Sequence, residues 1–358
     1  MVLFRGGIVS NIAFFAIIAL FLSILCTGAT AAPGSSGDIA SAYQISSQQH
    51  SAQSISATTG SSLTCLFTFR GTSYSFDIPY DTHLYTRLQA EQRRWPAGTS
   101  WEDHDSIGRY YNGYVHDPAA DEFFASLIKG LHEIRDQERL SPDEFVELCT
   151  AFVQQIPYDE NAGIVPRSPA EVVYENSGDC DEKSLLLIGI LAREGYGTSL
   201  IVFPDEAHAV AGLRVNGTVV GEDHIVAGND GTLYCLIEAT MPAFIGETGC
   251  IYDPASAHVF STSTGKEYAL AETAVAVSGW KRAEQGDLAT EKLRLNELKE
   301  EIQALGSSAA AHSYNALVSV YNRGAADYSQ HFIIYQQICA MTDDCGGAFA
   351  LLAANGYL

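Results

Sequence analysis

The chain has 358 residues, of which 47% are hydrophobic, enough for a sizeable core in one large or two ordinary domains. It carries 43 acidic and 20 basic residues, for a formal net charge of −23. This excess of negative charge argues against nucleic acid and against an anionic membrane surface as binding partners.

The N-terminus has the pattern of a leader. Arg5 precedes an apolar run that is purest from Ile12 to Leu25, and Ala29-Thr30-Ala31 offers an A-x-A cleavage site. The run has the length of a signal peptide, and counted from Ile8 it is long enough to span a bilayer. We therefore expect residues 1–32 to be a signal peptide or an N-terminal membrane anchor, with the remaining chain extracytoplasmic, either secreted or held at the cell membrane.

A polar stretch follows, and folded sequence is expected to begin after it. Residues 33–62 are rich in Ser, Ala, Gln and Gly, so they cannot bury enough surface to offset their ordering entropy, and we interpret them as a disordered tether. From Leu63, apolar residues alternate with polar ones on both sides of Arg70-Gly71-Thr72, which predicts a hairpin. The alternating residues are Cys65, Phe67 and Phe69, then Tyr74, Phe76 and Ile78.

Helical patterns occupy residues 81–93, 119–136 and 141–156, the last with a capping-box start at Ser141. Residues 95–118 lie between them and are rich in Trp, Tyr and His. They could form an aromatic loop that binds substrate or a long loop whose aromatic residues seal the core. We favour the second interpretation because aromatic side chains most often simply bury area.

Residues 168–194 form the stretch around which the chemistry is organised. Asn176 to Asp179 are turn and N-cap types, and an apolar helix follows from Leu185, so Cys180 is predicted at a helix N-terminus. Unpaired N–H groups and the helix dipole there stabilise a thiolate, the nucleophilic form of cysteine. The acidic neighbours of Cys180 would raise its pKa against the dipole. The plain alternative is a small buried core cysteine.

Two further residues suit a catalytic group. His208 opens a strand that follows the strand-like residues 199–203, and Asn216-Gly217 indicates a hairpin turn after it. Glu238 lies near the end of a third strand, residues 232–240, on an otherwise apolar face. A buried carboxylate needs a partner, and His208 is a suitable one.

The ordered set of motifs resembles the transglutaminase-like superfamily, whose members share a papain-like Cys-His-Asp/Glu core. The motifs are Pro157-Tyr158-Asp159, Pro169-Ala-Glu-Val-Val173, Gly178-Asp-Cys-Asp-Glu-Lys-Ser184 and Glu238-Ala-Thr240, and they are similar to those of extracytoplasmic archaeal and bacterial transglutaminase-like proteins. The resemblance covers residues 143–246. It implies an α+β fold in which the nucleophile helix packs on an antiparallel sheet, with Cys180, His208 and Glu238 as catalytic residues and no cofactor.

The chemistry implied is acyl transfer from an amide through a Cys180 thioester. The third member is Glu where eukaryotic transglutaminases have Asp, and no Trp accompanies His208. We therefore favour water as the acceptor, which gives a peptidase or amidase acting on protein, peptide or cell-wall amides. The alternative is a surface-displayed binding or scaffolding module that keeps this fold without turnover.

A zinc site and a different imidazole are two other interpretations of these residues. Cys180, His208 and Glu238 could ligate zinc, but they lack the short spacing of paired ligands, so no metal is expected. His224 is the alternative imidazole, and we interpret it as a solvated loop histidine.

The C-terminal region has a different pattern. Leu288, Leu295, Leu298, Ile302 and Leu305 repeat at helical spacing, and aromatic residues continue it after Gly306, which predicts an antiparallel helical hairpin over residues 283–341. The expected organisation is a domain over residues 63–280 and this hairpin within residues 281–358. The hairpin could pack on the catalytic core, which we favour, or mediate dimerisation; the oligomeric state stays open.

The cysteine count is consistent with export. Without Cys26 of the leader and the nucleophile, six cysteines remain, enough for three disulfide bonds. They are Cys65, Cys149, Cys235, Cys250, Cys339 and Cys345. Cys339 and Cys345 flank a short loop and are the pair we expect first.

Overall fold

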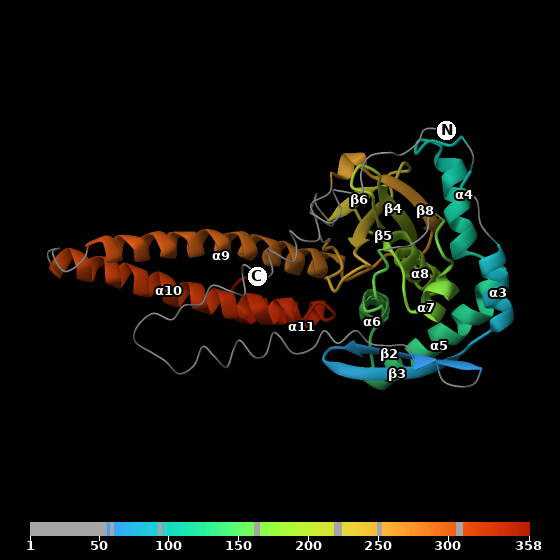
Figure 1. Ribbon diagram of the computed structural model, residues 1–358, viewed down its shortest axis with the longest axis horizontal. Coiled ribbons are helices and arrows are strands. Elements are labelled where there is room, and N and C mark those ends of the chain that lie inside the picture. The colour runs from blue at the N-terminus through green and yellow to red at the C-terminus, as the bar shows by residue number, and fades with distance from the viewer. Residues whose placement is uncertain are drawn as a thin grey trace. The chain divides into compact units, whose positions relative to one another are not determined.

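The computed structural model describes residues 56–57, 61–91, 95–96, 98–160, 165–217, 224–248, 253–305 and 311–358 (Figure 1). Its contacts divide the chain into residues 1–51 and 52–358, and every described residue belongs to the second unit. The expected leader and most of the expected tether lie outside the described residues. Within the described part, no helix is both long and apolar enough to cross a membrane.

The fold is α+β, as the sequence predicts. The strands are β1 (Ser56–Ala57), β2 (Ser62–Phe69), β3 (Thr72–Pro79), β4 (Thr198–Phe203), β5 (His208–Val215), β6 (Ile225–Ala227), β7 (Leu233–Ile237) and β8 (His258–Ser263). The α-helices are α3 (Thr82–Ala90), α4 (His104–Val115), α5 (Asp121–Glu138), α6 (Pro142–Gln154), α7 (Pro169–Glu175), α8 (Cys180–Arg193), α9 (Ala271–Leu305), α10 (Ala311–Cys339) and α11 (Cys345–Ala354). Short 3-10 helices occupy Pro118–Ala120 and Pro254–Ser256.

The N-terminal sheet confirms the predicted hairpin. Strands β2 and β3 pair antiparallel with Phe69 opposite Thr72, so the chain reverses at Arg70 and Gly71. The inward residues of both strands are buried, as the alternation indicated. The two-residue strand β1 pairs with the start of β2, so the last part of the stretch interpreted as a tether contributes to this sheet.

The second sheet carries the predicted site elements. Its order is β6-β7-β5-β4-β8, and every neighbouring pair is antiparallel. Helix α8 packs against β4, β5 and β8, and α6 packs on α8 (Figure 1). Residues 185–191 of α8 are almost completely buried, because this helix lies between the sheet and the other helices. The predicted arrangement of an apolar helix on an antiparallel sheet is therefore observed.

The prediction of a long loop over residues 95–118 is wrong for its second half, which forms helix α4. Asp103 caps this helix by accepting a hydrogen bond from the backbone N–H of Ser106. Ile107, Tyr111, Tyr114 and Val115 form its buried face, against β8 among other elements. That spacing was present in the sequence, but the surrounding Gly and aromatic residues have low helix propensity and obscured it. Sealing of the core, the favoured role, holds for these buried side chains.

The C-terminal helices are longer than predicted. Helix α9 begins at Ala271, before the expected domain boundary at residue 281, and its first turns are buried in the main core. Helices α9 and α10 then run side by side (Figure 1). They approach closely at Gly324, where a Cβ atom would lie 3.1 Å from Leu295 Cδ2. The hairpin is thus anchored on the core at one end, as favoured.

Arg70, at the turn of the N-terminal hairpin, fastens the C-terminal helices to the rest of the fold. Its guanidinium pairs with Glu144 and Glu147 of α6 at 3.1 Å each and with Asp344 at 3.2 Å. Burial raises the pKa of Glu147 to about 7, even though Arg70 acts to lower it. This cluster therefore joins the hairpin turn, α6 and the loop before α11.

The predicted disulfide bonds are not formed in the described part of the chain. Cys65, Cys149, Cys180, Cys235, Cys339 and Cys345 are free thiols there, and Cys250 lies outside the described residues. Cys339 ends α10 beside Tyr335, whereas Cys345 begins α11 with its backbone N–H donating to Glu147. Loop length favoured this pair, but the two helix ends place the cysteines in different surroundings.

Candidate active site

The structure places Cys180 at the N-terminus of a helix, as predicted. It is the first residue of α8, and Asp179 is the N-cap. A capping box closes the turn: Asp179 Oδ1 accepts from the N–H of Glu182 at 3.2 Å, and Glu182 Oε2 accepts from the N–H of Asp179 at 3.0 Å. The backbone N–H of Cys180 is therefore one of the N-terminal donors that point along the helix axis.

His208 opens β5, also as predicted. Residues 204–207 connect β4 to β5, and the register pairs Phe203 with His208. Ala207 has φ of +51°, a left-handed conformation that costs a non-glycine residue about 1–2 kcal/mol. A strained residue next to a candidate catalytic group is a common feature of functional sites.

Glu238 lies immediately after β7 and is 1% exposed. Its Oε2 is 3.0 Å from His208 Nε2, and its Oε1 accepts from the N–H of Thr240 at 2.9 Å and from Thr240 Oγ1 at 2.6 Å. Burial alone would raise the pKa of Glu238, but His208 and Thr240 outweigh it and lower the pKa to about 2. The predicted pairing of His208 with Glu238 is thus present, with an ionised carboxylate at neutral pH.

The nucleophile candidate lies against the same strand end. The backbone N–H of Ala209, the residue after His208, acts to lower the pKa of the Cys180 thiol. One turn along α8, Ser184 Oγ donates to the Ala209 carbonyl at 3.4 Å. The Ser184–Ala209 hydrogen bond joins the start of β5 to the first turns of α8, which pack together. Glu238 is one of the charges that act on the pKa of Cys180, so the thiol lies near the His208–Glu238 pair.

The surroundings of Cys180 oppose spontaneous ionisation of its thiol. Burial, followed by the charges of Asp181 and Asp179, raises the pKa of Cys180 above its ordinary value. The backbone N–H of Ala209 acts in the opposite direction but is too weak to compensate. The helix N-terminus therefore does not by itself produce a thiolate in the resting chain, and a base is required.

Two tyrosines flank the thiol. Tyr158 forms a backbone bridge with Gly178, two residues before Cys180, and its side chain is 38% exposed. Tyr111 of α4 is buried, and its ring lies 6.2 Å from Trp95, which is 36% exposed. Burial first, and then the charges of neighbours that include Asp179 and Asp181, raise the pKa of both phenols. Tyr111, from the aromatic segment 95–118, therefore lies near the candidate site.

Two alternatives for the site concern His224, as a different imidazole, and a bound metal ion. His224 is buried, not solvated, and its Nδ1 contacts the carbonyl of Gly246. This contact gives His224 a structural partner away from Cys180. No group of three or more His, Cys, Asp or Glu side chains in the described segments is arranged to hold a metal ion.

The contacts of two basic residues beside the site, Arg167 and Lys183, were not predicted. Arg167 Nη2 contacts Glu182 at 2.8 Å, and Lys183 donates to the carbonyls of Ile156 at 2.6 Å, Gln154 at 3.2 Å and Thr240 at 3.4 Å. A charged pair directly before a predicted buried helix, Glu182-Lys183, is the sequence pattern that could have indicated these partners.

Nothing matches this chain among family models, curated proteins or solved structures.

Proposed function

We propose that this chain is a thiol enzyme with a transglutaminase-like, papain-like core that cleaves amide bonds through a Cys180 thioester, with water as the usual acceptor. The observation that carries the proposal is the His208–Glu238 pair, 3.0 Å between Nε2 and Oε2, next to a cysteine at a helix N-terminus. Cys-His-acid groups perform nucleophilic acyl transfer in several unrelated folds. With the proposed leader, the enzyme would act outside the cytoplasm on protein, peptide or cell-wall amides.

His208 acts as the base in the first half-reaction. Because the pKa of Cys180 is raised, the thiol keeps its proton until His208 accepts it as the sulfur attacks the substrate carbonyl. Glu238 holds the imidazole by Nε2 and stabilises its positive charge, which leaves Nδ1 as the nitrogen for the proton. The backbone N–H of Cys180 stabilises the oxyanion.

The intermediate then collapses to products. The C–N bond breaks, the proton on His208 moves to the departing amine, and the acyl group stays on sulfur as a thioester. A water molecule gives a proton to His208 and attacks the thioester carbonyl. The C–S bond breaks, the acid is released, and Cys180 recovers its proton from His208.

The first test is the alkylation rate of Cys180 by iodoacetamide in the folded chain, followed by mass spectrometry at that residue. At pH 8, His208→Ala should lower the rate at least about tenfold, since general-base assistance contributes about 10²–10⁴-fold in enzymes. His224→Ala is the control, because that imidazole binds the carbonyl of Gly246.

A second candidate function, a binding or scaffolding module without turnover, is favoured by one observation. The acidic residues beside Cys180 raise its pKa, which an enzyme dependent on a preformed thiolate would avoid. Equal alkylation rates in wild type and His208→Ala would support the module and refute the enzyme.

A further inference from the structure

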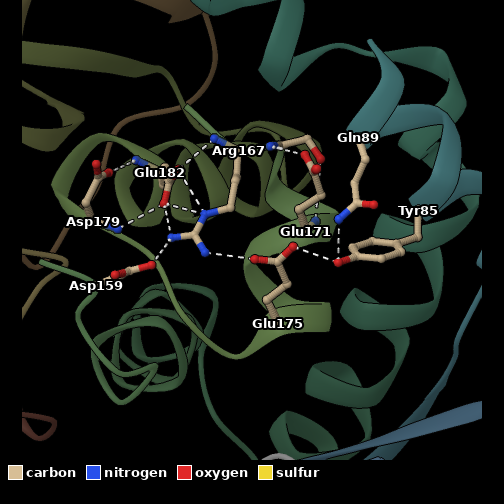
Figure 2. A network of polar contacts seen from close by, with 9 residues as sticks. Tyr85, Gln89, Asp159, Arg167, Glu171, Glu175, Asp179 and Glu182 are labelled. Carbon is tan, nitrogen blue, oxygen red and sulfur yellow. Dashed lines mark hydrogen bonds and ion pairs between the residues drawn. The ribbon is translucent and has the colours of Figure 1, made fainter. Parts of the chain in front are cut away.

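Arg167 lies at the centre of a network that surrounds the nucleophile turn (Figure 2). Its guanidinium contacts carboxylates from three segments: Asp159 after α6 at 3.0 Å, Glu175 at the end of α7 at 2.8 Å and Glu182 in α8 at 2.8 Å. Burial alone would lower the pKa of Arg167, but the hydrogen bonds to Glu182 and Glu175 raise it. The cation is therefore permanently charged.

Glu182 is the partner that matters most. It is 0% exposed, whereas the side chains of Asp159 and Glu175 are 25% and 28% exposed and are screened by water. Arg167 reaches it through Nε, Nη2 and its own backbone N–H, which donates to Oε1 at 2.7 Å. Removal of the cation would leave a buried carboxylate without its charged partner, a change that is strongly destabilising.

The same carboxylate holds the turn that carries the thiol. Glu182 Oε2 accepts from the N–H of Asp179, the residue before Cys180, so one carboxylate joins Arg167 to the N-cap of α8. Figure 2 shows Glu182 between Arg167 and Asp179, and the network continues through Glu175 to Tyr85 of α3. Arg167 and Glu182 are therefore linked to the residue directly before Cys180.

We propose that Arg167 is a positioning residue for the thiol chemistry: acting through Glu182, it holds the turn before α8 so that Cys180 faces His208. Arg167 does not touch the reacting atoms. The inference rests on the proposed function, because it assumes that the Cys180–His208 pair is the reactive unit.

The test compares two arginines that contact the same helix. Arg167 binds the first turn of α8, whereas Arg193 ends the helix, pairs with Asp121 at 2.8 Å and is similarly exposed, at 21% against 19%. We expect Arg167→Gln to lower the Cys180 alkylation rate at pH 8 at least about fivefold and Arg193→Gln to leave it unchanged. Arg167→Lys, which keeps the cation, should recover part of the rate.

A double-mutant cycle separates positioning from general weakening of the fold. If Arg167 holds Cys180 against His208, His208→Ala should lower the rate much less in Arg167→Gln than in wild type. Should Arg167→Gln unfold, Arg167→Gln with Glu182→Gln removes both buried charges of the pair, leaves Asp159 and Glu175 accessible to water, and should show the same loss of rate. Urea unfolding of each variant identifies those that are folded.

The outcomes distinguish the two hypotheses. An alkylation rate that depends on His208 by the same factor in wild type and in the folded Arg167 variants would overturn the positioning role and leave the proposed function standing. A wild-type rate that does not respond to His208→Ala would overturn the proposed function itself.

Discussion

Replacing Glu238 with Gln should lower turnover of p-nitrophenyl acetate by about a thousandfold or more, close to the residual rate of Cys180→Ala. The carboxylate accepts from His208 Nε2 and, with a pKa of about 2, is ionised at neutral pH. An amide at this position cannot stabilise the imidazolium and allows the wrong ring tautomer, a change that costs about 10⁴-fold in a serine protease triad. This ester suits the assay because release of p-nitrophenolate reports acylation of the thiol without knowledge of the natural substrate.

The matched control for this variant is Glu147→Gln. Glu147 is also a buried carboxylate paired with an arginine, but it lies in the Arg70 cluster and not at the site. Because the pKa of Glu147 is about 7, the amide resembles its protonated form, and turnover should stay within about twofold of wild type. Equal losses in the two variants would mean that Glu238 acts only on stability.

The local patterns of the site could be predicted from the sequence because they depend on short-range chemistry. An Asp followed three residues later by a Glu, as in Asp179 and Glu182, forms a capping box when it begins a helix. An apolar run such as residues 185–191 favours burial. The pairing of His208 with Glu238 followed from one further argument, that a carboxylate on an apolar strand needs a partner.

Contacts between distant segments could not be predicted in the same way. Arg167 and Lys183 each bind groups that only the tertiary fold brings together, and nothing in the local pattern names those groups. The pKa of Cys180 has the same origin: its sequence neighbours indicated the sign, but burial is the largest cause and comes from packing against β5. The disulfide prediction failed for a related reason, since cysteine count says nothing about where each thiol lies.

The second large effect is expected on stability, when Lys183 is replaced. Its side chain is completely buried, and Nζ donates to carbonyls of Gln154, Ile156 and Thr240. Three carbonyl acceptors match the three N–H bonds of the protonated amine, and the neutral amine, which predominates above about pH 7, can donate to two of them. Because Thr240 binds Glu238, the Lys183 amino group connects the end of α6 to the loop that carries the candidate catalytic carboxylate.

Lys183→Met should lower the free energy of unfolding by about 3 kcal/mol at pH 9, measured by urea denaturation. Met fills a similar volume but removes the two N–H donors that the neutral amine offers these carbonyls at pH 9, and each unsatisfied buried group costs about 1–3 kcal/mol. Lys281→Met is the control: Lys281 pairs with Glu247 at 2.6 Å but is partly exposed, so its loss should cost about 1 kcal/mol or less.

The stability difference between wild type and Lys183→Met should change with pH in a direction that the pKa of Lys183 determines. Burial lowers the pKa of Lys183 to about 7, although Glu238 acts to raise it, whereas an unfolded lysine titrates near its ordinary value of about 10.4. Between these values the unfolded chain binds the extra proton, so the contribution of Lys183 to stability rises as the pH increases from about 7 to 10. The difference between wild type and Lys183→Met should therefore be smaller at pH 6 than at pH 9. A difference that shrinks towards alkaline pH would show that the ammonium is held more tightly in the folded chain than in water, with the three carbonyls outweighing the effect of burial.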